Sequence, residues 1–268
     1  ELSDGQCHFR LHGRDSDPVV VLLHGATVPG WEFDRIVPHL NGAGFRTLCP
    51  DLFGHGYSAR PNTRHDHALF QRQIDDLLNI LGVESPVYLL GHSLGAAVAA
   101  RFAVRHPERV AGIVLVAPLL DFLSTQPVIR ILRVPLLGPL LVKHYLVPML
   151  VRRRTRRYAA IDDGRFVRMF RDQLRMPGFD RSLLSLLRSG ALGDQSDVYR
   201  ILQESTIPCF VTRGSDDEIF QQEHFLALQG LLPRAAYHEF PGLEHPMLLT
   251  HPETVAPAIC GHLSATMS

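Results

Sequence analysis

Gly91-His92-Ser93-Leu94-Gly95 is the stretch of sequence that decides the fold. The apolar run 87–90 before it predicts a buried strand, and the small residues 96–100 after it predict a helix. A serine with glycines two residues before and two after it, between a strand and a helix, is typical of a tight turn that raises a nucleophile above a sheet. Such pentapeptides also occur by chance, so the flanking strand and helix carry the specificity. We therefore interpret Ser93 as a candidate nucleophile.

Outward from this stretch, apolar runs of strand length alternate with amphipathic stretches of helix length. Continuous apolar runs are typical of parallel strands that are buried on both faces. The alternation predicts an α/β fold, with a mostly parallel sheet flanked by helices. The expected strands are 19–23, 46–50, 87–90, 112–117, 208–212 and 235–240, the clearest expected helices are 69–81 and 94–105, and a last helix begins near Pro252.

Residues 119–196 break this alternation, because they are rich in Leu and Arg, resemble helices and show no clear strand pattern. This segment holds 14 Lys and Arg against 6 Asp and Glu, a net charge of +8. The rest of the chain holds 13 against 21, a net charge of −8. We therefore predict a core domain made of 1–118 and 197–268, with a basic helical cap, or lid, made of 119–196.

The densest basic run of the predicted cap is 152–157. Such a run is most often a solvated helix face. The alternative interpretation is a contact with anionic head groups, coenzyme A or an acidic carrier protein, which includes peripheral contact with a membrane. The apolar region 128–150 is interrupted by three basic residues and three prolines, so we do not expect a transmembrane helix there.

The composition is that of a globular protein. The 268 residues are 46% hydrophobic and 20% charged, which suffices for a large core, and the formal net charge of zero gives no sign of nucleic-acid binding. Four widely spaced cysteines match no zinc or CxxC pattern, so we expect free thiols and a cytoplasmic location. Residues 1–4 do not resemble a signal peptide, but the sequence does not begin with Met, so a removed targeting segment stays an open alternative.

His24-Gly25-Ala26 directly follows the expected strand 19–23. From this position, a backbone N–H group can point at the same place as the N–H of Leu94, the residue after the candidate nucleophile. Two such donors form an oxyanion hole, which stabilises the tetrahedral intermediate of acyl transfer. We assign Ala26 and Leu94 to this role, with Thr27 as a weaker alternative.

A general base and an acid that orients it are expected at the ends of later strands. His245 follows the expected strand 235–240 and is the favoured base, with His251 as the weaker candidate. Carboxylates stand at 216–218, after the strand 208–212, and Asp121 lies beyond the strand 112–117. Position alone leaves these carboxylates open as the acid.

These stretches together resemble the α/β-hydrolase fold superfamily over nearly everything outside 119–196. Residues 51–58 are similar to the family's D-x-x-G-x-G-x-S loop, and 106–110 to its H-P-E-R-V stretch. The family places its acid three residues after a glycine, so Gly214 points to Asp217, with Asp216 as the nearest rival. The resemblance implies a triad of Ser93, His245 and Asp217, and the stretches 24–26 and 91–95 are similar to serine esterases such as the monoacylglycerol lipases.

Three positions differ from relatives in the family. Glu244 stands before the histidine where glycine is usual. Its negative charge is expected to raise the pKa of His245, or its side chain to narrow the product side of the active site. Ala96 replaces a second glycine after the nucleophile. Ser93 itself argues against the dehalogenase and epoxide-hydrolase branches, whose nucleophile is a carboxylate.

The resemblance implies a serine hydrolase that cleaves carboxylic esters through an acyl-enzyme, without a metal or organic cofactor. The apolar pairs within 128–147 pack the cap onto the core in the simpler interpretation; in the functional one they bind a small-molecule ester with a medium or long, lipid-like acyl chain. Alternatives are thioester or amide hydrolysis, C–C cleavage or perhydrolysis by the same triad, and a ligand receptor that turns over little.

Overall fold

The computed structural model describes residues 1–123, 129–132, 134–159 and 164–267. Within these ranges, seven strands form one sheet in the order β1-β3-β2-β4-β5-β6-β7. Every neighbouring pair is parallel except β1 with β3 at one edge, which is antiparallel. The strands are β1 Phe9–His12, β2 Val19–Leu23, β3 Arg46–Pro50, β4 Val87–His92, β5 Val110–Val116, β6 Cys209–Gly214 and β7 Ala236–Phe240.

All six expected strands are present, with ends shifted by at most a few residues. β1 was not predicted, because its four residues alternate too briefly to give a pattern and none of them is fully buried. It lies at the edge of the sheet and pairs only with β3. The mostly parallel α/β architecture is confirmed.

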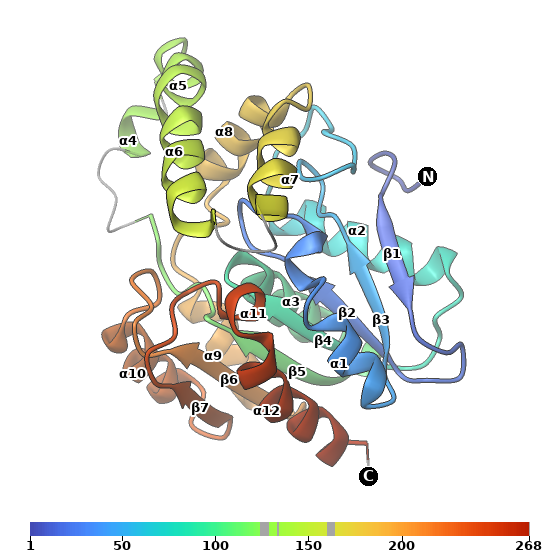
Figure 1. Ribbon diagram of the computed structural model, residues 1–268. Coiled ribbons are helices and arrows are strands. Elements are labelled where there is room, and N and C mark those ends of the chain that lie inside the picture. The colour runs from blue at the N-terminus through green and yellow to red at the C-terminus, as the bar shows by residue number, and fades with distance from the viewer. Residues whose placement is uncertain (124–128, 133, 160–163, 268) are drawn as a thin grey trace.

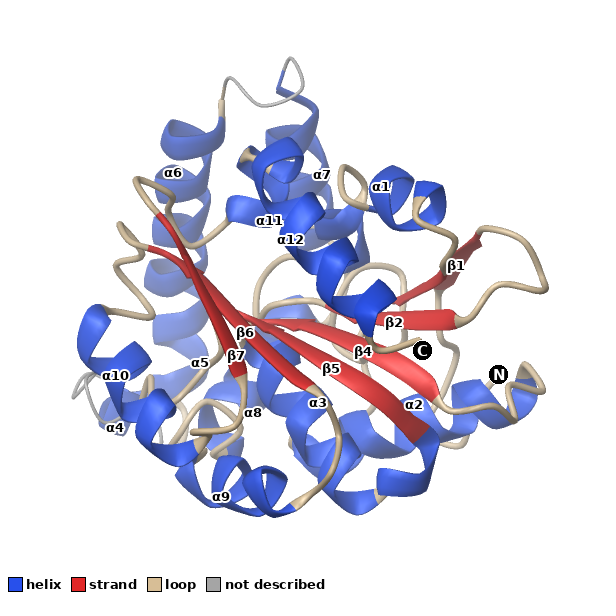
Figure 2. Ribbon diagram, turned by 90° about the horizontal axis from the view of Figure 1, so that it is seen from below, coloured by secondary structure: helices blue, strands red, loops and turns tan. Residues whose placement is uncertain are grey.

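Helices cover both faces of the sheet (Figure 2). The central strands are buried on both sides because alternate residues point to opposite faces: Val21 and Leu23 of β2 join one hydrophobic cluster, and Val20 and Leu22 join the other. One face carries α1 Val37–Gly42, α11 Met247–Thr250 and α12 Pro252–Ala265, and the other carries α2 His67–Ile80, α3 Leu94–Arg105, α9 Ser196–Glu204 and α10 Gln222–Leu231.

A further group of helices lies above the ends of the strands in Figure 1. They come from the described part of 119–196, where no strand occurs, as expected from the sequence. The division of the chain into a core domain and a separate cap stays a prediction. These helices are α4 Ile129–Leu132, α5 Leu137–Leu141, the π-helix Val142–Leu146, α6 Val147–Tyr158, α7 Arg165–Leu174 and α8 Phe179–Ser189.

Candidate active site

Ser93 lies in a strained turn between β4 and α3, with φ 54° and ψ −115°. The turn requires its two glycines, because a Cβ on Gly95 would lie 1.9 Å from the carbonyl oxygen of Leu23, and one on Gly91 would lie 2.3 Å from the oxygen of Gly95. The N–H of Ser93 donates to the carbonyl of Val116 at 3.0 Å, which fixes the turn to β5. The local sequence therefore forms the tight strand–turn–helix that was expected around Ser93.

His245 follows β7, Asp217 follows β6, and the two side chains meet. His245 Nδ1 lies 2.7 Å from Asp217 Oδ2, and both side chains are buried. The other carboxylate oxygen of Asp217 accepts the N–H groups of Ile219 and Phe220, each at 2.8 Å. These bonds hold the carboxylate so that it orients the imidazole.

Burial and hydrogen bonding set the charges of this pair. Burial alone would raise the pKa of Asp217, but His245 and the two N–H groups outweigh it and hold the pKa below its usual value. Burial lowers the pKa of His245, and Asp217 opposes that effect only in part. The carboxylate is thus ionised and the imidazole neutral near pH 7, as a general base must be.

Burial dominates the pKa of the imidazole beside Glu244. The pKa of His245 is lowered rather than raised, with burial as the largest cause and the charges of His92 and Arg154 acting in the same direction. The contribution of Glu244 itself stays a prediction, because burial dominates the pKa of this imidazole.

A cavity of about 230 Å³ brings the predicted site residues together. Ser93, His245 and the loop residues Gly25, Ala26 and Thr27 all contribute to its wall. Among the described residues, no hydrogen bond joins Ser93 Oγ to His245; in unliganded enzymes such contacts often tighten only when substrate binds. Leu94 is the first residue of α3, and the first turn of a helix leaves its N–H groups without partners inside the helix.

Two of the rival residues, Asp216 and His251, have other partners. Asp216 accepts a hydrogen bond from the hydroxyl of Ser215 at 2.8 Å, and His251 contacts the hydroxyl of Thr250 on the exposed surface. Asp121 lines a smaller adjoining cavity. It is Asp217 that bonds to the imidazole of His245.

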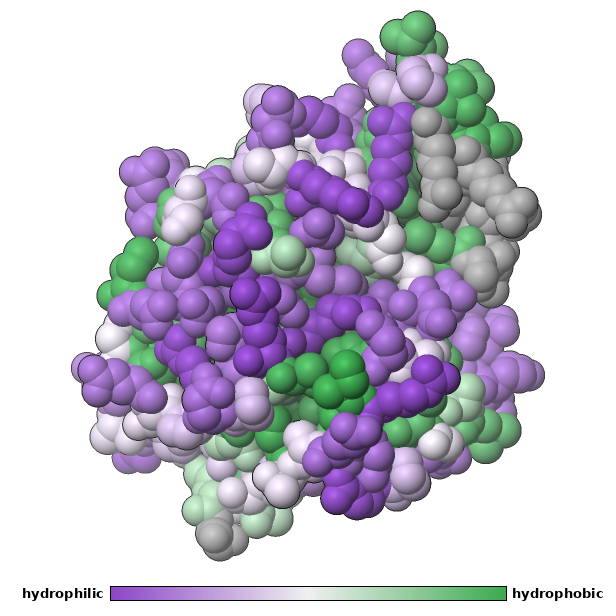
Figure 3. Space-filling view, turned by 180° about the vertical axis from the view of Figure 1, so that it is seen from behind, coloured by the Kyte–Doolittle hydropathy of each residue, from purple (hydrophilic) through white to green (hydrophobic). Residues whose placement is uncertain are grey.

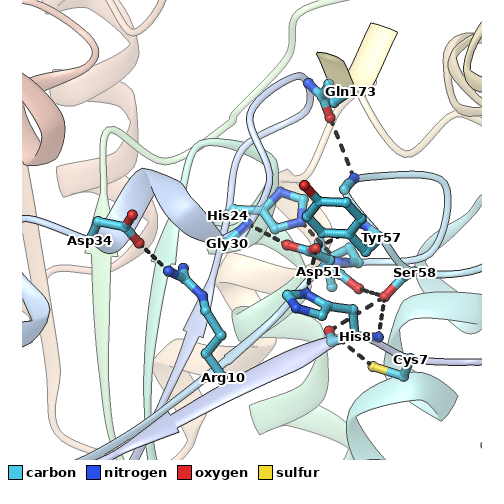
Figure 4. Close-up of polar contacts among 12 residues, drawn as sticks. Cys7, His8, Arg10, His24, Gly30, Asp34, Asp51, Tyr57, Ser58 and Gln173 are labelled. Carbon is cyan, nitrogen blue, oxygen red and sulfur yellow. Dashed lines mark hydrogen bonds and ion pairs between the residues drawn. The ribbon is translucent and has the colours of Figure 1, made fainter. Parts of the chain in front are cut away.

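The motif 51–58 supports the loop that carries Ala26 (Figure 4). Asp51 accepts the N–H of Gly30 at 2.8 Å and that of Tyr57 at 3.0 Å, and it contacts His8 Nδ1 at 2.8 Å. His24 Nε2 accepts the N–H of Leu52 at 2.9 Å, which ties the first residue of the loop to the motif.

Glu32 and His92 form a buried pair behind the nucleophile that sequence reasoning missed. His92 Nδ1 lies 2.9 Å from Glu32 Oε1, and His92 Nε2 lies 3.0 Å from the carbonyl oxygen of His245. Both ring nitrogens face acceptors, so His92 is an imidazolium. Burial would lower the pKa of His92, but the Glu32 carboxylate outweighs it and raises the pKa.

Glu32 also reaches the predicted oxyanion loop. Its second oxygen, Oε2, accepts the N–H of Gly25 at 3.0 Å. The pair therefore links this loop, the elbow and the histidine loop. A histidine at the end of a fully buried strand signals that a polar partner exists, but the sequence alone does not identify Glu32 as that partner.

In the described ranges, no cluster of three or more His, Cys, Asp and Glu side chains could hold a metal ion. The four cysteines are free, as expected. No helix in the described part of the chain is both long enough and apolar enough to cross a membrane.

An elbow serine and a strand-end Asp–His pair at one edge of a mostly parallel sheet define the class of α/β-fold hydrolases. Residues 18–141 match the family model of the alpha/beta hydrolase fold. The chain has the α/β-hydrolase fold, and a little under half of it matches the family model. Its place in the monoacylglycerol lipase-like branch stays a prediction.

The comparisons agree on the fold but not on one reaction. The chain is 27% identical to a non-heme chloroperoxidase from Streptomyces lividans over 91% of its own length and 90% of the relative's. It is 26% identical to a 2-hydroxy-6-oxo-6-phenylhexa-2,4-dienoate hydrolase from Burkholderia cepacia, over 90% and 86%. The haloalkane dehalogenase DbeA from Bradyrhizobium elkani has a TM-score of 0.81 at 20% identity, covering 100% of this chain and 97% of that one, which shows the fold alone.

The first curated relatives share only a part with this chain. They are uncharacterized mycobacterial proteins, 35% identical over 109 residues, and the match spans 41% of this chain and 31% of theirs. These relatives therefore do not establish the activity of the chain, which we propose below from its site.

Proposed function

We propose that the protein is a serine hydrolase that cleaves carboxylic esters. The observation that carries this proposal is the 2.7 Å contact of His245 with Asp217, in a cavity that Ser93 also lines. An activated serine, a neutral buried imidazole and an ionised partner are the groups that acyl transfer needs.

In the proposed reaction, His245 takes the proton of Ser93 as the serine oxygen attacks the ester carbonyl. The N–H groups of Ala26 and Leu94 stabilise the oxyanion that forms. His245 then gives its proton to the leaving alcohol. Water hydrolyses the acyl-enzyme by the same route, with His245 as the base again, and Ser93 is restored.

The proposed substrate carries an apolar part. Leu119, Leu146, Leu150, Leu183 and Leu187 line the cavity beside the site, and four of them lie in or next to α6 and α8. We infer that 119–196 acts as a cap whose helices bind a medium or long acyl chain.

Two other reactions use the same groups. The chloroperoxidase and the dienoate hydrolase align with most of this chain, so perhydrolysis and C–C hydrolysis are the second candidates. Dehalogenation is disfavoured because the elbow carries a serine, whereas the dehalogenase branch uses a carboxylate as nucleophile.

The test uses a fluorophosphonate probe and a series of p-nitrophenyl esters of increasing acyl length. We expect the probe to label the protein but not Ser93→Ala, and ester hydrolysis to fall by about three to four orders of magnitude in Asp217→Asn. Asp216→Asn is the matched control and should keep its activity. Labelling that survives Ser93→Ala, or hydrolysis of none of the esters, would reject the proposal.

We also propose that the tip of the α4–α6 group, formed by Leu136, Leu140 and Tyr145, contacts an anionic lipid surface. Large apolar side chains are exposed there, with Leu136 83% and Tyr145 66% exposed, and Figure 3 shows green surface over this region at the upper right. Exposed basic residues on the same segment, Lys143, Arg152 and Arg156, complement anionic head groups. The apolar wall of the cavity begins at Leu146 and Leu150 on this segment, so the tip is continuous with the site.

A further inference from the structure

Arg154 faces the cavity beside Ser93. It lies on α6 and is one of two arginines that line the cavity wall, the other being Arg153. A guanidinium in a largely apolar cavity is costly to desolvate, so it needs an anionic partner or several acceptors. The charged and polar groups around Arg154 therefore decide what its guanidinium can bind.

Among the described residues, Arg153 has an acidic partner and Arg154 has none. Arg153 Nη2 lies 3.2 Å from Glu218 Oε2, and Glu218 also lines the cavity. The other acidic residue of the wall, Glu32, uses both oxygens on His92 and Gly25. Among the residues that the structure describes, no carboxylate lies within ion-pair distance of Arg154.

Neutral partners hold the Arg154 side chain in place. Its Nη1 donates to the hydroxyl of Tyr158 at 3.1 Å, and its Nη2 donates to Thr27 Oγ1 at 3.1 Å. The guanidinium also lies over the Tyr158 ring, 5.4 Å from its centroid. These contacts hold the guanidinium of Arg154 in place without neutralising its charge. The contact with Thr27 places it next to the predicted oxyanion loop.

From this geometry we propose that Arg154 binds a carboxylate group of the substrate. The inference rests on the proposed ester hydrolysis and narrows its substrate class to esters with an apolar body and an anionic end. One planar guanidinium matches one carboxylate. The charge of Arg154 also acts on His245, so a bound carboxylate would partly offset its effect on the base.

A purely structural role would give a different result. If Arg154 only joined α6 to the loop at Thr27, its loss would weaken hydrolysis of charged and neutral esters alike. The test therefore compares matched substrates that differ only in charge and reads the ratio of their kcat/KM values.

The first arm uses mono-p-nitrophenyl esters of dicarboxylic acids from adipate to sebacate, each against its primary-amide analogue. The second uses 4-acetoxybenzoate against 4-acetoxybenzamide, which places the charge on the leaving group. We expect the acid to be preferred over the amide by about tenfold to a hundredfold in at least one arm, mainly through KM. The arm that shows the preference identifies the end of the substrate that Arg154 meets.

Variants assign the preference to this residue. Arg154→Gln should bring the ratio to about one or below, and Arg154→Lys should retain a part of it, because the ammonium keeps the charge but not the fork. Arg152→Gln is the matched control: it lies on the same helix, is exposed and does not line the cavity, so its ratio should equal that of the wild type. If Arg154→Gln does not fold, the wild-type ratios and Arg154→Lys decide.

The outcomes separate the two proposals. Two results would overturn the role of Arg154 alone. One is hydrolysis of the amide-bearing esters through Ser93 with no preference for the carboxylate-bearing esters. The other is a ratio of kcat/KM values that Arg154→Gln leaves unchanged. No hydrolysis of any ester, together with no labelling of Ser93, overturns the proposed function itself.

Discussion

The protonation state of His245 sets the acid limit of the proposed reaction. Burial lowers the pKa of its imidazole, so the neutral form persists to lower pH than the ordinary value of about 6.5 would allow. The base must be neutral to take the proton of Ser93, and activity is lost as the pH falls through the lowered pKa. We expect kcat/KM for a neutral ester to show an acid limb below pH ~6.5. A profile from about pH 4 to 8 measures it, and a limb above pH ~7 would contradict it.

The buried pair of Glu32 and His92 gives a second prediction, for stability. Glu32→Gln leaves a buried imidazolium without its counter-charge, so the free energy of unfolding should fall by about 3–5 kcal/mol. Urea unfolding measures the loss. The double variant Glu32→Gln/His92→Asn should lose less than the sum of the two single variants, because the unpaired charge is removed together with its partner.

The matched control for this pair is Glu218→Gln. Glu218 pairs with Arg153, and both side chains are more than half exposed, 64% and 61%. Solvent screens an exposed pair, so the loss should be no more than about 1 kcal/mol. Equal losses in the two carboxylate variants would refute the ion-pair account of Glu32 and His92.

At the scale of single residues, the sequence predicted the candidate triad better than the residues around it. Ser93 and His245 could be proposed because a strand–turn–helix and a strand-end loop leave short, local patterns, whereas Asp217 also needed the resemblance to the family. Glu32 and Arg154 leave no such pattern, because each acts through a partner far away in the chain, at His92 and Thr27. Contacts of that kind exist only in the folded structure.

Among the elements, the start of α3 packs so closely on the sheet that there is no space for a side chain at Gly95. A Cβ on Gly95 would lie 1.9 Å from a carbonyl oxygen of β2, so Gly95→Ala must displace backbone. We expect the free energy of unfolding to fall by at least about 1–3 kcal/mol, together with slower labelling of Ser93 by the probe.

Gly230→Ala is the control for this substitution. Gly230 lies in α10, and no atom lies within 4 Å of an added Cβ. Alanine is the better helix former, so this variant should gain about 0.5–1 kcal/mol. Thermal or urea unfolding of both variants decides, and a Gly95→Ala protein as stable as wild type would show that the elbow is less tightly packed than the structure indicates.

The elements themselves follow from their patterns to different degrees. The buried parallel strands and the helices α2 and α3 are long and regular, so the sequence predicts them within a few residues. β1 is missed because it depends on pairing with β3 rather than on its own residues. The segment after β5 was predicted only as helical, since its Leu-rich pattern does not show where one helix ends and the next begins.

For the whole molecule, the opposite charges of its two parts are the feature that composition alone conceals. A total of zero hides +8 in 119–196 and −8 elsewhere. Opposite charges favour contact between the two parts, as in the pair of Arg165 with Asp34 at 3.1 Å. Arg152 and Arg156 of α6 are exposed, and the proposed anionic lipid surface would contact them.

Vesicle binding tests that last point. We expect the protein to sediment with vesicles of phosphatidylcholine and phosphatidylglycerol but not with phosphatidylcholine alone, and to be released as salt rises, because each basic residue near an anionic surface contributes about 1 kcal/mol. Leu136→Ser/Leu140→Ser should weaken binding, since both side chains are exposed at the tip. Leu226→Ser should not, because Leu226 is about as exposed as Leu140, 56% against 55%, but lies on α10. Binding that ignores lipid charge and these leucines would reject the proposed contact. A dimer that the tip substitutions dissociate would assign the apolar tip to a second copy of the chain instead.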